Sequence, residues 1–414
     1  MDDGSHRVIE RVARESYGRL VAYLAARTHD VAGAEDALAD AFMAALRTWP
    51  RDGVPTSPEA WLLTAARRRL IDRARHDRVR TDAEPTIRLL IGDAHPLDDE
   101  AFPDDRLKLL FVCAHPDIDR GMHTPLMLQV VLGLDAATIA SAFLTSPAAM
   151  GQRLTRAKAR IRDAGLAFEI PDQHLLPSRL DAVLEAIYAA YGSGWEDVAG
   201  SDPRTRGLAA EALWLARLLR QLLPEEPEAQ GLLALMLYCE ARRPARRAST
   251  GKYVPMSEQD TSLWTSSMID EAERSLATAA RHQRPGRFQL EAALQSAHVE
   301  GARRGRTEWQ AIVVLYDGLV RLAPTTGALV GRAAAVADAQ NPASGLRALD
   351  AIDPNHTRSY QPYWAVRAHL LHRAGRVREA LDAFDRAIGL TEDPPTRDFL
   401  IERRAHASVG DTQG

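Results

Sequence analysis

Residues 135–163 read DAATIASAFLTSPAAMGQRLTRAKARIRD, and this stretch decides the fold. It lacks alternating β-branched runs, and Asp135 and Ser146 stand where helix N-caps are expected. Pro147 follows Ser146, and proline is favoured in the first helical turn. Four apolar side chains recur at helical spacing and define the buried side of the second helix: Met150, Leu154, Ala157 and Ile161. The stretch therefore predicts two helices joined by a short turn.

The polar side of the second predicted helix carries groups that can read DNA. In a helix-turn-helix, the second helix enters the major groove and its N-terminal part meets the base edges. Glutamine and arginine make paired hydrogen bonds with adenine and guanine, and other cations contact phosphates. Two residues depart from the usual pattern, Thr138 and Gly151, and the glycine weakens the helix by about 0.5–1 kcal/mol relative to alanine.

Two further helices are predicted near the N-terminus. Residues 30–49 carry one continuous apolar stripe, with Asp30 as a plausible N-cap. A second helix begins at Ser57-Pro58-Glu59 and continues to about Arg78. Alanine, leucine, arginine and glutamate recur at helical spacing along nearly the whole chain. We therefore expect an all-α protein.

The net charge of −4 conceals strong blocks of charge. Residues 67–80 contain seven arginines against two aspartates, and residues 153–162 contain five cations and no acid. Between these blocks, residues 93–105 contain six acids and no base. A single arginine-rich helix is ordinarily a solvated surface. Two basic helices separated by an acidic linker instead indicate two modules that bind one polyanion.

These segments together resemble a known family. Residues 30–37 with Phe42 are similar to the polymerase-binding helix of sigma factor domain 2, and residues 61–75 resemble the helix that melts and reads the −10 element. Residues 126–158 resemble sigma domain 4, which reads the −35 element. Four shorter segments resemble the extracytoplasmic-function subgroup that has a tetratricopeptide-like C-terminal extension: residues 104–109, 113–116, 240–246 and 289–293.

The resemblance implies three sets of contact residues and two partners, core RNA polymerase and promoter DNA. The set expected to bind the clamp helices of the largest polymerase subunit is Glu35, Asp36, Asp40 and Phe42. The set expected at the −10 element is Trp61, Arg67, Arg68, Arg69, Arg73, Arg75 and Arg78. The set expected at the −35 element is Ser146, Gln152, Arg153, Arg156, Lys158 and Arg160.

The same resemblance implies a domain organisation. We expect sigma domain 2, a helical bundle, in residues 1–80, and an acidic linker in residues 81–105. Sigma domain 4, with its helix-turn-helix, is expected in residues 106–165. A tetratricopeptide-like regulatory domain is expected in residues 166–414. We expect this last domain to modulate transcription, with intramolecular docking on the sigma domains as one possible route.

The C-terminal half has its own repeat signal. Residues 309–324 and 375–390 resemble the second helix of a tetratricopeptide unit, and Tyr316 and Phe384 stand 68 positions apart, twice the 34-residue repeat. Residues 204–238, broken at Pro224, resemble a more degenerate pair. Residues 242–260 are expected to form an exposed loop. Such arrays present a concave binding surface, and a purely structural helical cap is the alternative.

Composition and motifs limit the classes of protein to which the chain can belong. A chain of 414 residues corresponds to two or three domains, and its two cysteines lie far apart without metal-ligand spacing. There is no signal peptide at the N-terminus and no apolar run long enough for a membrane span, so a cytoplasmic protein without membrane contact is expected. No catalytic motif is present, so we expect no enzyme activity, no cofactor and no metal. Cys113 and His115 are expected in the core.

Two alternatives from other classes remain open. The first is a tetratricopeptide adaptor with a degenerate sigma-like N-terminus, and the second is a dimeric helix-turn-helix repressor. An adaptor would not need the basic blocks 67–80 and 153–162. A repressor would have no use for the predicted polymerase-binding helix. Both observations favour a sigma factor.

Overall fold

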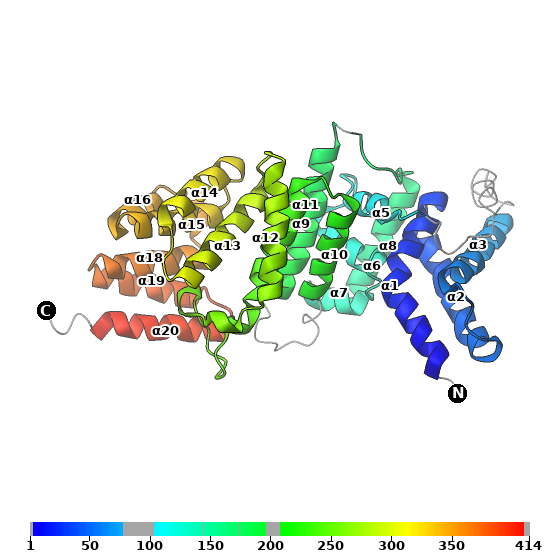
Figure 1. Ribbon diagram of the computed structural model, residues 1–414, viewed down its shortest axis with the longest axis horizontal. Helices are drawn as coiled ribbons and strands as arrows, with labels where there is room; N and C mark the ends of the chain where they lie inside the picture. The colour runs from blue at the N-terminus through cyan, green and yellow to red at the C-terminus, as the bar shows by residue number, and fades with distance from the viewer. Residues whose placement is uncertain (1–2, 78–102, 144, 173, 196–207, 410–414) are drawn as a thin grey trace. The chain divides into compact units, whose positions relative to one another are not determined.

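The computed structural model describes residues 3–77, 103–143, 145–172, 174–195 and 208–409. These residues are almost entirely α-helical, and their only β-type pairing is an isolated bridge between Arg247 and Tyr253 (Figure 1). The all-α prediction is therefore confirmed. The described residues divide into two compact units, an N-terminal unit that ends at Leu215 and a C-terminal unit that begins at Ala216.

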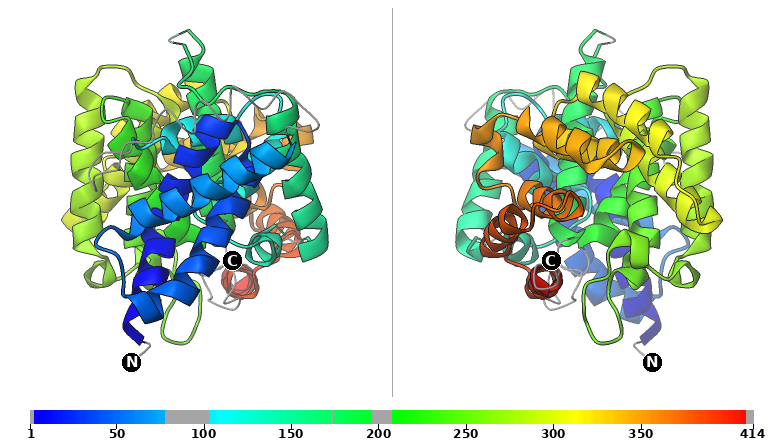
Figure 2. Two further views of the ribbon diagram at one scale, coloured as in Figure 1. Left: turned by 90° about the vertical axis from the view of Figure 1, so that its right-hand side faces the viewer. Right: turned by 90° about the vertical axis from the view of Figure 1, so that its left-hand side faces the viewer.

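The N-terminal unit begins with three helices that pack on one another, α1 (Asp3–Thr28), α2 (Val31–Asp52) and α3 (Pro58–Asp77) (Figure 2, left). The predicted apolar stripe of α2 is buried over most of its length, through Ala34, Ala37, Leu38, Ala41, Ala45 and Trp49. The stripe is narrower than predicted because Phe42 is only half-buried and Leu46 is 36% exposed.

Four shorter helices follow in the same unit: α5 (Arg106–Cys113), α6 (Arg120–Val130), α7 (Ala136–Ala142) and α8 (Pro147–Asp163). The buried side predicted for α8 is confirmed at all four positions, Met150, Leu154, Ala157 and Ile161. The caps predicted at Asp135 and Ser146 form, whereas Asp30, predicted as the N-cap of α2, makes no side-chain capping hydrogen bond. The Asp135 carboxylate accepts a hydrogen bond from the Thr138 amide at 2.8 Å, and the Ser146 hydroxyl accepts one from the Ala149 amide at 3.2 Å.

Helix α9 (Leu176–Trp195) also belongs to the N-terminal unit, although it lies beyond the boundary predicted at residue 165. It packs against α5 and α6 and buries Val183, Leu184 and Ile187. Two hydrogen bonds fix its position, from the Thr124 hydroxyl to the carbonyl of Ala186 at 2.9 Å and from Arg179 to the carbonyl of Phe111 at 2.6 Å. The N-terminal unit thus extends into the residues that follow the predicted sigma domain 4.

Helix α10 (Leu208–Leu222) begins in the N-terminal unit and ends in the C-terminal unit. It is followed by α11 (Pro227–Ala241), so a break around Pro224 separates two helices as predicted. The C-terminal unit continues through α12 (Ser266–Arg281), α13 (Arg287–Arg304), α14 (Trp309–Leu322), α15 (Thr326–Ala339), α16 (Pro342–Asp350), α17 (Pro354–Thr357), α18 (Gln361–Arg373), α19 (Val377–Gly389) and α20 (Pro394–Val409).

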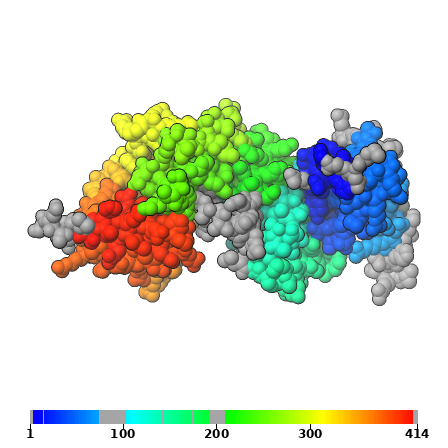
Figure 3. Space-filling view, turned by 90° about the horizontal axis from the view of Figure 1, so that it is seen from below, coloured from blue at the N-terminus to red at the C-terminus, as the bar shows by residue number. Residues whose placement is uncertain are grey.

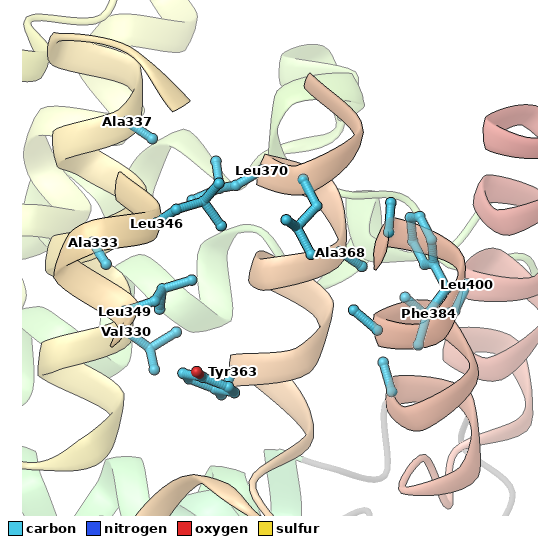
Figure 4. Packing of buried hydrophobic residues seen from close by; sticks show 14 of the residues in the cluster. Val330, Ala333, Ala337, Leu346, Leu349, Tyr363, Ala368, Leu370, Phe384 and Leu400 are labelled. Atoms are coloured by element: carbon cyan, nitrogen blue, oxygen red, sulfur yellow. The ribbon is translucent and has the colours of Figure 1, made fainter. Parts of the chain in front are cut away.

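Most long helices of the C-terminal unit pack on the next helix in sequence or on the one after it, as α13 does on α11, which is the contact pattern of a helical array. Residues of α15, α16, α18, α19 and α20 point into one shared apolar core, with Leu346, Leu370 and Phe384 among its members (Figure 4). A second core joins α13, α14 and α15 through Leu294, Ile312 and Ala335.

The loop between α11 and α12 departs from the nearest-neighbour pattern. It contains three short 3₁₀ helices, Arg243–Arg246, Met256–Glu258 and Thr261–Leu263, and it lies against α20 (Figure 3; Figure 2, right). Three ion pairs hold it there: Arg247 with Asp393 at 3.0 Å, Lys252 with Glu402 at 2.5 Å, and Glu258 with Arg403. The Tyr253 ring also packs edge-on against the Phe399 ring.

The prediction of an exposed loop over residues 242–260 is therefore wrong in part. Arg242 is only 8% exposed, because its guanidinium donates to the carbonyl of Tyr238, to the Met256 sulfur and to the amide oxygen of Gln295. The local sequence is rich in proline, glycine and serine. It gives no sign of contacts with residues that are distant in the chain.

Candidate functional site

The outer face of α2 combines acidic and apolar side chains. Asp36 and Asp40 are exposed, as a polymerase-binding role requires. Met43 is 49% exposed and Leu46 is 36% exposed on the same helix. Sequence reasoning missed Met43, although its position three residues after Asp40 and seven after Asp36 places it on their face. We refer to the four side chains Asp36, Asp40, Met43 and Leu46 as the α2 patch.

Helix α3 presents part of the set predicted for the −10 element. Arg68, Arg69 and Arg73 are exposed, and Arg73 pairs with Asp36 of the α2 patch at 3.3 Å. Both partners of this pair are more than half exposed, so solvent screens their attraction. The side chain of Arg75 and the whole of Arg78 lie outside the described residues.

Two other residues of the set predicted for the −10 element, the aromatic Trp61 and the cationic Arg67, are less accessible to DNA. Trp61 is half-buried, and its ring packs edge-on against Trp49 with 5.4 Å between ring centroids. Arg67 is 8% exposed, so a direct contact with DNA is not possible in this conformation. Its guanidinium donates a hydrogen bond to the Tyr23 hydroxyl and lies 5.0 Å from the centroid of that ring.

The position of Arg67 corrects the prediction for that residue. It lies four residues after Leu63 and three before Leu70, both of which are buried. Helical geometry therefore turns Arg67 toward the core, whereas Arg68 and Arg69 are turned outward. The three consecutive arginines look alike in the sequence, so the difference in their exposure was missed. The helical spacing of Arg67 from Leu63 and Leu70 could have revealed it.

Helix α8 exposes most of the set predicted for the −35 element. Gln152, Arg153, Arg156 and Arg160 are exposed on the side opposite its four buried residues, and the N-cap residue Ser146 is exposed as well. A hollow of about 320 Å³ beside this face is lined by Ile118, Met122 and Ala157, by Asp117 and Asp119, and by Arg153, Arg156 and Arg160. The carboxylate of Asp117 lies 3.6 Å from the Arg160 guanidinium, and both side chains are about half exposed.

Lys158 is the exception on α8. Its side chain is only 14% exposed, and its amine lies 2.7 Å from a carboxylate oxygen of Glu35, whose side chain is 12% exposed. The Tyr17 hydroxyl donates a hydrogen bond to the other oxygen of Glu35 at 3.2 Å. Burial, together with the nearby Glu35 charge and this hydrogen bond, raises the pKa of Tyr17, so the hydroxyl keeps its proton.

The structure thus brings together residues that the sequence assigned to different partners. Glu35 was predicted to bind polymerase and Lys158 to bind DNA, yet each neutralises the other. The linker predicted to end at residue 105 also takes part in packing at its end. Asp105 is 3% exposed, and its carboxylate pairs with Arg27 of α1 at 3.3 Å and with Lys108 at 2.8 Å. Linker residues 81–102 lie outside the described residues.

Other kinds of site have little support in the described part of the chain. No group of three or more histidine, cysteine, aspartate or glutamate side chains there is arranged to hold a metal ion. Cys113 is fully buried, as predicted, and burial raises the pKa of its thiol. None of the described helices combines the length and apolar character needed to cross a membrane.

Comparisons with known proteins find family matches in both parts of the chain. The Sigma-70 region 2 family model matches residues 13–80, and a family of unknown function, DUF6596, matches residues 179–280. The ECF RNA polymerase sigma factor SigC of Mycobacterium tuberculosis is 30% identical over 175 residues, which cover 41% of this chain and 87% of SigC. The probable RNA polymerase sigma-C factor of Mycobacterium bovis matches to the same extent.

These matches define a sigma factor, a transcription initiation protein that acts with core RNA polymerase. The chain belongs to the extracytoplasmic-function family of sigma-70 factors and carries an additional C-terminal DUF6596 region. An uncharacterised protein of Rhizobium meliloti, R00370, is 39% identical over 95% of this chain and 94% of its own length, so the two-part organisation is shared. No solved structure matches the chain.

The contrast between Arg67 and Arg68 gives a testable prediction about α3. Arg67→Ala should lower the free energy of unfolding by about 1.5–3 kcal/mol, because it removes a buried charged donor from Tyr23. Arg68→Ala, one position along on the exposed face, should change stability by less than about 0.5 kcal/mol. Thermal unfolding followed by circular dichroism compares the two variants. Equal stability of both would contradict the inward placement of Arg67.

Proposed function

We propose that this sigma factor directs core polymerase to specific promoters through three faces of the N-terminal unit, and that its C-terminal unit sets its activity. In this proposal the α2 patch binds the clamp helices of the largest polymerase subunit. The exposed arginines of α3 contact the −10 element, and α8 reads the −35 element. The observation that carries the proposal is α8, where arginines and Gln152 are exposed directly opposite a buried apolar side.

The chemistry of the α2 patch supports protein binding. Large apolar side chains that stand in solvent beside carboxylates are characteristic of a binding surface, since the apolar groups gain from burial and the charges orient the partner. Met43 adapts its flexible side chain to an irregular surface. Asp36 already holds Arg73, so a basic partner would compete for its carboxylate.

A double charge reversal tests the α2 patch. Asp36→Lys with Asp40→Lys should weaken association with core polymerase by about tenfold or more, since two orienting charges become repulsive. The matched control is Glu10→Lys with Glu15→Lys, which makes the same change in net charge at two exposed positions of α1. Co-purification with core polymerase measures both. If the two double variants bind equally well, the α2 patch is not the polymerase-binding face.

The exposed side of α8 supports promoter recognition. Its first ten residues include Gln152, Arg153 and Arg156, the residue types that read adenine and guanine edges. Helix α8 is continuous through Gly151, where an added Cβ would meet only Ala136, at 4.0 Å. The departure at Thr138 also has a local role, because its hydroxyl and amide both donate to the N-cap residue Asp135.

Arginine removal on α8 tests promoter reading. Arg153→Ala and Arg156→Ala should each weaken promoter binding by the holoenzyme, by about 1–3 kcal/mol for a base contact and less for a phosphate contact. Arg162→Ala is the matched control, because Arg162 is exposed near the end of the same helix and pairs with Asp163. Binding to promoter fragments selected by the holoenzyme provides the measurement. Full binding by the Arg153/Arg156 double variant would refute the assignment.

The C-terminal unit is proposed to be a regulatory, tetratricopeptide-like array. Two observations support this proposal: successive helices of the unit pack on one another, and Tyr316 and Phe384 stand at the spacing of the repeat. Covalent attachment gives such an array a high effective concentration near the promoter-binding helices. Helix α9 is not part of this proposed array, since it packs against α5 and α6 of the N-terminal unit.

Two truncations separate these roles. Ending the chain after Trp195 keeps α1 to α9 and should change run-off transcription substantially while these helices stay folded. Ending it after Leu166 removes the acceptor of the Thr124 hydroxyl and the Arg179 donor to the Phe111 carbonyl, and it exposes the apolar faces of α5 and α6, so this protein should also lose thermal stability. Equal transcript yield from the full chain and the longer truncation would reject the regulatory role.

A further inference from the structure

A hollow of about 300 Å³ lies between helix α20 and the loop that joins α11 to α12. A volume of this size is at the lower end of the range for small-molecule pockets. The lining includes two residues of the loop and four of the helix: Lys252, Tyr253, Pro394, Asp398, Phe399 and Glu402. All of them belong to the C-terminal unit, so the hollow is separate from the faces proposed to bind polymerase and DNA.

Two aromatic rings form the apolar part of the hollow. The Tyr253 ring packs edge-on against the Phe399 ring, with 5.3 Å between the ring centroids. A cation already uses one of these rings, because the Arg403 guanidinium lies 5.0 Å from the Phe399 centroid. Aromatic faces attract cations, and a flat guanidinium can also stack on them, which a compact ammonium cannot. The rings therefore favour a planar cation.

Two carboxylates form the polar part of the hollow. Asp398 and Glu402 are exposed and stand four residues apart on α20, so they lie on the same side of the helix. Like charges at this spacing destabilise a helix. The amine of Lys252 lies 2.5 Å from a Glu402 oxygen, whereas the Asp398 side chain has no hydrogen bond or ion pair with any described residue. The lining thus carries one more negative than positive charge.

The Lys252 amine marks a position that a cation can occupy. Its hydrogen bond to Glu402, together with the charges of Glu402 and Asp398, raises the pKa of Lys252, so the amine stays protonated. Both members of the Lys252–Glu402 pair are at least half exposed, so solvent screens their attraction. A second cation can therefore compete with the Lys252 amine for this position.

We propose that this hollow binds a guanidinium group that is carried on a short apolar stem. The guanidinium lies between Asp398 and Glu402 in place of the Lys252 amine, and the stem packs against the two aromatic rings. Because the loop and α20 both contact the ligand, its binding stabilises the docked position of the loop. The site does not depend on the promoter role proposed for the N-terminal unit.

Ligand-observed NMR titration of the full-length protein at low salt tests the site. The probe is n-butylguanidinium, and it should bind about twofold or more tightly than n-butylammonium, which cannot stack on the rings. Asp398→Asn should weaken binding of the probe about three- to fivefold, since it removes one of the two carboxylates. The matched control is Asp382→Asn, the same change at an exposed position of α19, which should bind like the parent. Equal binding by the two variants, or none by the parent, would overturn the proposal.

Removal of the competing amine gives a second readout with the opposite sign. Lys252→Ala frees Glu402, so it should bind the probe about twofold or more tightly than the parent. Arg321→Ala removes an exposed cation from α14 and controls for the change in net charge. Weaker binding by Lys252→Ala than by Arg321→Ala would show that the amine helps to hold the ligand, contrary to the proposal.

Hydrogen exchange tests the effect on the loop. The amides of Ala248 and Val254 donate to carbonyls of the same loop, those of Lys252 and Arg246, each at 2.9 Å. Both amides should exchange more slowly in the parent when the probe is bound, and unchanged exchange would refute stabilisation of the docked loop.

A last titration identifies the source of the guanidinium. The peptide acetyl-Gly-Arg-Gly-amide should bind more tightly than n-butylguanidinium if the natural ligand is an arginine of a polypeptide. Weaker binding of the peptide would assign the site to a free small molecule. Binding of neither compound would reject the site.

Discussion

The close approach of α1 to the residues that follow α6 sets the arrangement of the whole N-terminal unit. Helix α1 is packed with α2 and α3, and the segment after α6 leads directly into α7 and α8. The backbone contact at Gly18 and Val131 therefore joins both groups of helices, which also meet where α1 packs on α5 and α2 on α8. The ion pairs of Arg27 with Asp105 and of Lys158 with Glu35 join the same two groups of helices.

Features set by local sequence were predictable. The caps at Asp135 and Ser146 and the buried side of α8 depend on residues within a few positions of one another, so helical periodicity is enough to find them. The break near Pro224 and the all-α character follow in the same way. The acidic face of α2 was also readable, although its apolar member Met43 was overlooked in favour of Phe42.

Features set by distant contacts were not predictable. Glu35 and Lys158 are 123 residues apart, and neither has a neighbour in sequence that announces the pairing. Arg67 stands in a run of three arginines whose different exposures depend on how α3 is rotated toward Tyr23. Helix α9 has the composition of any apolar helix, and its packing against α5 and α6, with the hydrogen bonds from Thr124 and Arg179, assigns it to the N-terminal unit.

The loop held against α20 gives the C-terminal unit a property that simple helical arrays lack. An array with neighbour contacts alone can acquire its structure progressively as the ribosome delivers each helix. Here Arg247 must wait for Asp393, which is synthesised 146 residues later, and Lys252 must wait for Glu402, which is 150 residues later. The loop thus reaches its final geometry only after α20 has emerged, and partially translated chains carry it undocked. Any surface to which the docked loop contributes is therefore formed late in biosynthesis.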